Sequence, residues 1–172
     1  MSTNKKNFSL LMENTPGVLS RIAGLFTRRG FNIDSITAGV TDDPHLTRMT
    51  IATHGDDEVI NQIVKQLAKL EEVIQIRELK DECSVIRELI LVRVAVNEQE
   101  RAQVISMAEV FRAKVVDIAE DNVIFELTGD HQMIEAFLKL LGSSRIQKVA
   151  RTGAAGLPRG MFNSDETEIY NR

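Results

Sequence analysis

The chain has 172 residues, 43% hydrophobic and 27% charged, a balance typical of one medium or two small globular domains and not of a disordered chain. Its 25 acidic and 21 basic residues give a net charge of -4, which disfavours a broad surface for nucleic acid. A single cysteine excludes an internal disulfide, and no apolar run reaches the roughly 20 residues of a membrane span, so we expect a cytoplasmic protein without nucleic-acid or membrane partners.

The N-terminal part of the chain predicts a strand followed by a helix. Residues 8–12 alternate loosely between apolar and polar side chains, and residues 13–17 break that pattern. We expect Pro16 at the first helical position with Thr15 as the N-cap, and Gly30 at the helix end. The predicted apolar stripe of this helix consists of Leu19, Ile22, Ala23 and Phe26.

Four further elements complete a first βαββαβ order. Residues 33–40 and 46–53 predict two strands joined by a turn at 41–44. Residues 73–79 predict a closing strand. Between the strands at 46–53 and 73–79 lies a helix whose predicted apolar stripe is Ile60, Ile63, Val64, Leu67 and Leu70.

The same order recurs in the second half of the chain. It begins with four alternating β-branched residues, which predict a strand: Ile90, Val92, Val94 and Val96. A helix with Val104, Ile105, Ala108 and Phe111 follows, and two short strands then meet around residues 120–122, the second with Val123, Phe125 and Leu127. The last helix ends at Gly142, before a strand at 145–150, and its predicted stripe is Ile134, Phe137, Leu138 and Leu141.

The repeat predicts an α+β fold of two tandem ferredoxin-like βαββαβ domains, in which both helices cover one face of an antiparallel sheet. We expect a first domain at residues 1–80, a linker at 81–86, a second domain at 87–153 and a mobile tail at 154–172. Because the second strand of this topology lies at a sheet edge, residues 33–40 are expected to pair with their counterpart in another chain and form a homodimer.

Three activities known for this topology need residues that this sequence lacks, in the loop between the first strand and the first helix or on the central strands. A metal chaperone needs a pair of cysteines there, and the loop has none. An RNA-binding version needs aromatic side chains on the central strands, where Thr47, Met49, Ile51 and Thr53 stand. An acyl-phosphate hydrolase needs an arginine in the loop, and the nearest, Arg21, lies more than a turn inside the helix.

The loop does fit a free amino acid as ligand. A helix N-terminus offers unpaired N–H groups and partial positive charge to a carboxylate. Gly17 permits close approach of the ligand, and the Asn14 amide can both donate and accept hydrogen bonds. Asn32, just before the edge strand, faces the Asn14 loop of a partner in a side-by-side dimer. The same residues also suit a helix entry without any ligand, so this alternative remains open.

Other polar residues give no strong functional signal. His45, His54 and His131 lack the spacing of metal ligands, and Asp42 and Asp43 before a proline are typical of a turn, so no metal site is expected. Arg151 and Arg159 near the tail are candidate partner contacts.

Motifs spread over nearly the whole chain resemble the small regulatory subunit of acetohydroxyacid synthase, also called acetolactate synthase. They stand at residues 10–19, 28–33, 41–44, 48–51, 65–67, 69–70, 87–89, 111–113, 136–137 and 150–153. The resemblance implies an N-terminal ACT domain and a related C-terminal domain. It also implies that the chain has no catalytic residues, activates a large catalytic subunit and confers feedback inhibition by valine.

In this family valine binds between paired ACT domains, and the resemblance places its site at Asn14, Thr15, Pro16, Gly17, Val18, Leu19, Asn32 and Ile33. Thiamine diphosphate, magnesium and FAD belong to the catalytic subunit, so the resemblance implies no cofactor in this chain. The alternative function is that of a generic ACT-domain amino-acid sensor that regulates another enzyme or a transcription factor.

Overall fold

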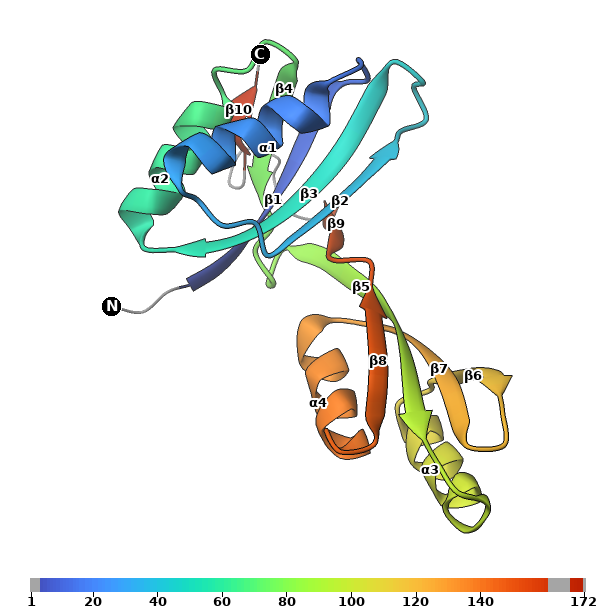
Figure 1. Ribbon diagram of the computed structural model, residues 1–172. Helices are drawn as coiled ribbons and strands as arrows, with labels where there is room; N and C mark the ends of the chain where they lie inside the picture. The colour runs from blue at the N-terminus through green and yellow to red at the C-terminus, as the bar shows by residue number, and fades with distance from the viewer. Residues whose placement is uncertain (1–3, 161–167, 172) are drawn as a thin grey trace. The chain divides into compact units, whose positions relative to one another are not determined.

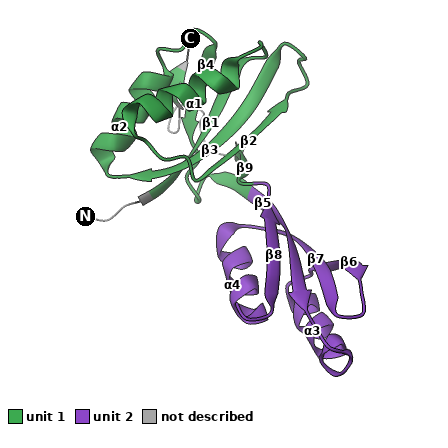
Figure 2. Cartoon of the chain, in the orientation of Figure 1, with its two compact units in different colours: residues 1–86, 153–172 green, residues 87–152 purple. Residues whose placement is uncertain are grey.

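The computed structural model describes residues 4–160 and 168–171, which form two compact units. Figure 2 shows the first unit, residues 1–86 with 153–172, in green and the second, residues 87–152, in purple. Of the predicted tail, residues 161–167 and 172 lie outside the described residues. Within the described ranges, no helix is long and apolar enough to cross a membrane.

The first unit is an antiparallel sheet with two helices on one face (Figure 1). The helices are α1 (Val18–Arg29) and α2 (Asp57–Leu67). The strands are β1 (Asn4–Glu13), β2 (Ser35–Val40), β3 (Leu46–Gly55), β4 (Val73–Glu78) and β10 (Glu168–Asn171), in the order β10-β4-β1-β3-β2. The strand β2 therefore lies at one edge, as the sequence predicts.

The core of the first unit lies between this sheet and its helices. On the central strands, Phe8 pairs with Ile51 and Leu10 with Met49, and all four side chains are buried. Tyr170 of β10 packs against the same core, so the C-terminal strand adds to this unit an element that the sequence analysis did not assign.

Helix α1 begins later and faces the sheet differently than predicted. Its N-cap is Gly17, so Thr15 is not the cap and Pro16 is not the first helical residue. The predicted stripe is wrong at Leu19 and Ala23, which are exposed. The buried face consists of Val18, Ile22, Leu25 and Phe26, at the i, i+4, i+7 and i+8 positions of a helix that starts at residue 18. In α2 the prediction is confirmed except for Leu70, which follows the helix but packs against the core.

The second unit repeats the βαββαβ order and confirms the predicted fold class. Its helices are α3 (Glu98–Val110) and α4 (His131–Leu141). Its strands are β5 (Ser84–Ala95), β6 (Lys114–Ile118), β7 (Asn122–Gly129) and β8 (Ile146–Arg151), in the order β6-β7-β5-β8. Three of the residues predicted as linker, 84–86, already belong to β5.

The core of the second unit is built from the predicted alternating and helical stripes. Val104 and Ala108 of α3 are buried, whereas Ile105 and Phe111 are partly buried against the core. The remaining buried members lie in the strands, in α4 or, for Val96, directly after β5: Ile90, Val92, Val94, Val96, Val123, Phe125, Leu127, Ile134, Phe137 and Leu141.

Residues 153–158 return to the first unit, and Gly153 lies against the sheet face that has no helices. A Cβ on Gly153 would come within 2.8 Å of the Ser35 side chain and 3.1 Å of the Thr37 hydroxyl, both on β2. Beyond it β9 (Ala155–Pro158) pairs with β5. Ser9 and Thr50, which point to this helix-free face, are buried. The predicted tail thus contains two short strands, β9 and β10.

Candidate functional site

The N-terminus of α1 lacks a capping side chain. Gly17, its N-cap, has φ 88° and ψ -6°, a left-handed conformation that glycine adopts without the steric cost of a side chain. In the part of the chain that the structure describes, no side chain caps the first turn, and that turn has no acidic residue. Its backbone N–H groups and the positive end of the helix dipole are thus not neutralised by the chain's own carboxylates.

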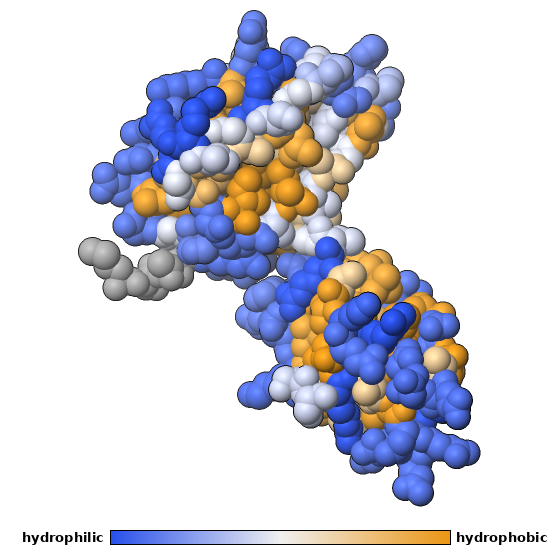
Figure 3. All heavy atoms as spheres, in the orientation of Figure 1, coloured by the Kyte–Doolittle hydropathy of each residue, from blue (hydrophilic) through white to orange (hydrophobic). Residues whose placement is uncertain are grey.

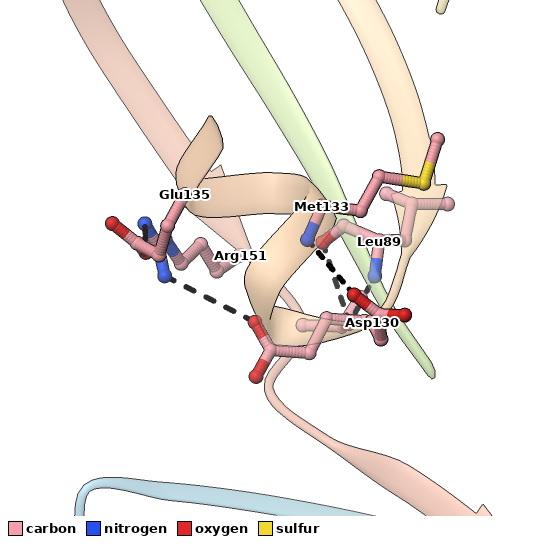
Figure 4. Close-up of polar contacts among 7 residues, drawn as sticks. Leu89, Asp130, Met133, Glu135 and Arg151 are labelled. Carbon is pink, nitrogen blue, oxygen red and sulfur yellow. Dashed lines mark hydrogen bonds and ion pairs between the residues drawn. The ribbon is translucent and has the colours of Figure 1, made fainter. Parts of the chain in front are cut away.

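The other three helices have side-chain caps. Asp56 accepts from the Val59 N–H at 2.9 Å, and Asn97 accepts from the Glu100 N–H at 2.8 Å. Figure 4 shows the third cap, in which the Asp130 carboxylate accepts from the Met133 N–H at 2.8 Å. Such caps occupy the position at which an external anion would bind, so among the four helices of residues 4–160 and 168–171 only α1 leaves it open.

The loop before α1 is fixed by the turn between β2 and β3. The Asn14 backbone N–H donates to the His45 carbonyl at 2.7 Å, and the Asn14 side-chain amide donates to the Pro44 carbonyl at 3.0 Å. This side chain has two N–H donors and one acceptor, so a second donor and the carbonyl oxygen remain for a ligand. Thr15 and Pro16, next in the loop, are exposed. Asn14 is therefore both positioned and accessible.

Asn32 lies in a second polar cluster, before β2. Its side-chain amide donates to the Asp34 carboxylate at 2.7 Å, and His54 of β3 contacts the same carboxylate at 2.8 Å. The backbone carbonyl of Asn32 accepts a hydrogen bond from the buried Thr53 hydroxyl at 2.6 Å. Within one chain, the hydrogen bonds of Asn32 therefore go to a different group of residues than those of Asn14.

The apolar members of the predicted site divide between core and surface. Val18 is buried and Ile33 packs against the core, so both side chains support the loop from within. Leu19 is 53% exposed on the first turn of α1 and offers an apolar contact beside the open helix terminus. Leu19 was predicted both in the apolar stripe of the helix and in the binding site, and its exposure is compatible with the second position only.

The partners of these asparagines were missed by the sequence analysis. His54 and Asp34 are distant in sequence, and only the pairing of β2 with β3 brings them together.

On the helix-free face of the same sheet, burial lowers the pKa of the Arg48 guanidinium, the nearby Arg77 lowers it further, and Asp42 opposes the shift. The described residues include no group of three or more His, Cys, Asp or Glu placed to hold a metal ion.

Two motifs from opposite ends of the second unit lie side by side. Arg151 of β8 pairs with Glu135 of α4 at 2.7 Å (Figure 4). Its second terminal nitrogen lies 4.0 Å from the buried carboxylate of Glu88. The backbone N–H of Leu89 donates to the Thr152 hydroxyl at 3.1 Å. These contacts join residues 87–89 to residues 150–152, and Arg151 connects β8 to both β5 and α4.

The fold and the open helix terminus define a ferredoxin-like module suited to bind a small anionic ligand at a loop-helix junction. A family model described as AHAS small subunit-like ACT domain matches residues 8–75, and one described as small subunit of acetolactate synthase matches residues 87–160. The chain belongs to the acetolactate synthase small subunit family.

Individual relatives agree over most of the chain. A probable acetolactate synthase small subunit of Archaeoglobus fulgidus is 46% identical over 91% of this chain and 98% of its own length. The acetolactate synthase isozyme 3 small subunit of Salmonella typhimurium is 42% identical over 91% and 96%. The crystal structure of the small subunit from Thermotoga maritima superposes with a TM-score of 0.81 at 38% identity, covering 91% of this chain and 98% of that one.

Proposed function

We propose that this chain is the regulatory subunit of an acetolactate synthase, that it activates a separate catalytic subunit, and that valine binding to its first unit makes the enzyme sensitive to feedback inhibition. Membership of the family supports the regulatory role. The uncapped N-terminus of α1, beside an accessible Asn14, is the observation that carries the choice of a free amino acid as ligand.

In this proposal the ligand carboxylate accepts hydrogen bonds from the first-turn N–H groups of α1. The Asn14 amide bonds to the ammonium group through its free carbonyl oxygen, and Leu19 contacts the apolar side chain. Hydrogen bonds to charged groups contribute roughly 1.5–3 kcal/mol each. After the cost of ordering the ligand, two or three of them correspond to about micromolar to millimolar affinity.

A second chain completes the proposed site. The edge strand β2 pairs with β2 of a partner, which forms a homodimer and places the partner's Asn32 against the Asn14 loop. Valine then bridges two chains and shifts the population of the state bound to the catalytic subunit, for which a coupling of about 1–3 kcal/mol is sufficient. Thiamine diphosphate, magnesium and FAD act in the catalytic subunit, so this chain contributes regulation and no catalytic group.

Asparagine substitutions test the proposal in the reconstituted holoenzyme. In Asn14→Ala and Asn32→Ala, inhibition by valine should be lost while activation of the catalytic subunit persists, because each change removes one polar contact to the ligand. Calorimetry with the full chain should show weaker valine binding. Asn122→Ala is a matched control, because that half-buried side-chain amide lies in the second unit and donates to the neighbouring Asp121. Full valine inhibition in both site variants would refute the assignment.

A further inference from the structure

The side-chain amide of Asn32, an exposed residue just before β2, has a fixed orientation. Its nitrogen donates to a carboxylate oxygen of Asp34 at 2.7 Å. An ionised carboxylate accepts hydrogen bonds and donates none, so the nitrogen end of the amide must face Asp34. The side chain therefore presents its oxygen, which is an acceptor only, on the side away from Asp34.

The carboxylate of Asp34 is itself held by His54 of β3. The Nδ1 atom of His54 lies 2.8 Å from Oδ1 of Asp34 and 3.0 Å from Oδ2, so one ring nitrogen contacts both oxygens. The backbone of Asn32 is fixed separately, because its carbonyl accepts from the Thr53 hydroxyl at 2.6 Å. A change at Asp34 should therefore alter the orientation of the Asn32 amide and not the position of the residue.

The surroundings of this amide favour a cationic donor as its partner. Figure 3 shows hydrophilic residues at the end of the first unit where the chain enters β2, next to an apolar patch between α1 and β2. Asp34 places a negative charge directly behind the Asn32 amide. A carboxylate that accepts from an amide nitrogen polarises the amide and makes its oxygen a stronger acceptor. The ammonium group of an amino acid gains more from such an oxygen than a neutral donor does.

We propose that Asp34, held by His54, makes the effector site selective for amino acids over 2-oxo acids, because it fixes the acceptor end of Asn32 toward the ligand. This inference rests on the proposed valine site, in which the ammonium group lies between Asn14 and the partner's Asn32. The Pro44 carbonyl orients the Asn14 amide in the same way, so two amide oxygens meet the ammonium group. A 2-oxo acid offers only acceptor atoms there and receives no donor, and a site built for a donor rejects an analogue that lacks it. Asp34 and His54 act through Asn32 and are positioning residues.

Calorimetric titration of the full chain with valine and with 2-oxo-3-methylbutanoate, its 2-oxo analogue, tests the selectivity. The unaltered chain should bind valine at least about tenfold more tightly than the oxo acid. In Asp34→Asn the new amide can donate to the Asn32 oxygen, so the Asn32 amide turns and presents its N–H groups to the ligand. Valine affinity should then fall by about tenfold or more, whereas affinity for the oxo acid should stay the same or rise. A merely structural role of Asp34 would lower both affinities together.

Two further variants complete the test. Asp121→Asn is the matched control, because Asp121 likewise accepts from the side-chain amide of a neighbouring asparagine, Asn122, at 2.7 Å in the second unit; both affinities should remain unchanged. His54→Ala keeps the bond between Asp34 and Asn32 but releases the carboxylate, so it should weaken valine binding by a smaller factor than Asp34→Asn does. Equal losses for both ligands in Asp34→Asn, or an unchanged preference for valine, would overturn this inference alone. Absence of valine binding to the unaltered chain would refute the proposed function and this inference with it.

Discussion

The same substitution at two glycines of one helix should have opposite effects on stability. Gly17, the N-cap of α1, has φ 88°, whereas Gly24 lies in the interior of the same helix. A Cβ added at either position meets nothing within 4 Å, so steric contacts with neighbouring side chains contribute to neither variant. Only the backbone conformation distinguishes the two sites.

The expected magnitudes follow from that conformation. Gly17→Ala forces an alanine into a left-handed region, which costs roughly 1–2 kcal/mol of the free energy of unfolding. Gly24→Ala reduces the conformational freedom of the unfolded chain and improves helix propensity, so it should stabilise the unit by about 0.5–1 kcal/mol. Gly17→Asn should cost less than Gly17→Ala, because asparagine tolerates the left-handed conformation better.

Urea unfolding followed by tyrosine fluorescence measures these differences. The chain has one tyrosine and no tryptophan, and Tyr170 packs against the core of the first unit, so the signal reports on the unit that contains both glycines. Shifts of the midpoint at constant slope give the change in free energy. The reasoning is refuted if both alanine variants change stability in the same direction, or if Gly17→Asn is less stable than Gly17→Ala.

Two further substitutions test features described above. Asp130→Ala removes the cap of α4 and should cost about 1 kcal/mol of stability, measured by urea unfolding of the second unit with circular dichroism; an unchanged midpoint would contradict the role of the cap. Gly153→Ala combines a left-handed φ of 85° with a Cβ only 2.8 Å from the Ser35 side chain, so it should destabilise the first unit more than Gly17→Ala does. Tyrosine fluorescence makes that comparison, and the reverse order would show that the segment after residue 152 is not held against β2.

The fold class was predictable because both units follow strong periodic patterns. The alternation of Ile90, Val92 and Val94 has a single interpretation, and the stripes of α2 and α4 recur at helical spacing. The short strands β9 and β10 have no such pattern. They exist because β5 and β4 offer edges for them to pair with, and a sequence window does not show which edges remain open.

The candidate site was predictable in its residues but not in its geometry. Asn14 and Gly17 stand where the loop chemistry predicts. The sequence favoured Thr15 as the cap because threonine caps helices well, but the left-handed Gly17 ends the loop two residues later and rotates the helix so that Leu19 faces outward. The contact of Asp34, the partner of Asn32, with His54 depends on strand pairing between distant segments.

The first unit is discontinuous in the chain, because residues 87–152 are inserted between its two parts. During synthesis, every residue of the second unit has been made before the segment that contributes β9 and β10 exists. The second unit can therefore complete its fold first, whereas the first unit is complete only after its last strand, β10, has been synthesised. A nascent or truncated chain that ends before residue 153 lacks the contact of Gly153 with Ser35 and Thr37 on the helix-free face of β2, and it lacks the strand that pairs with β4.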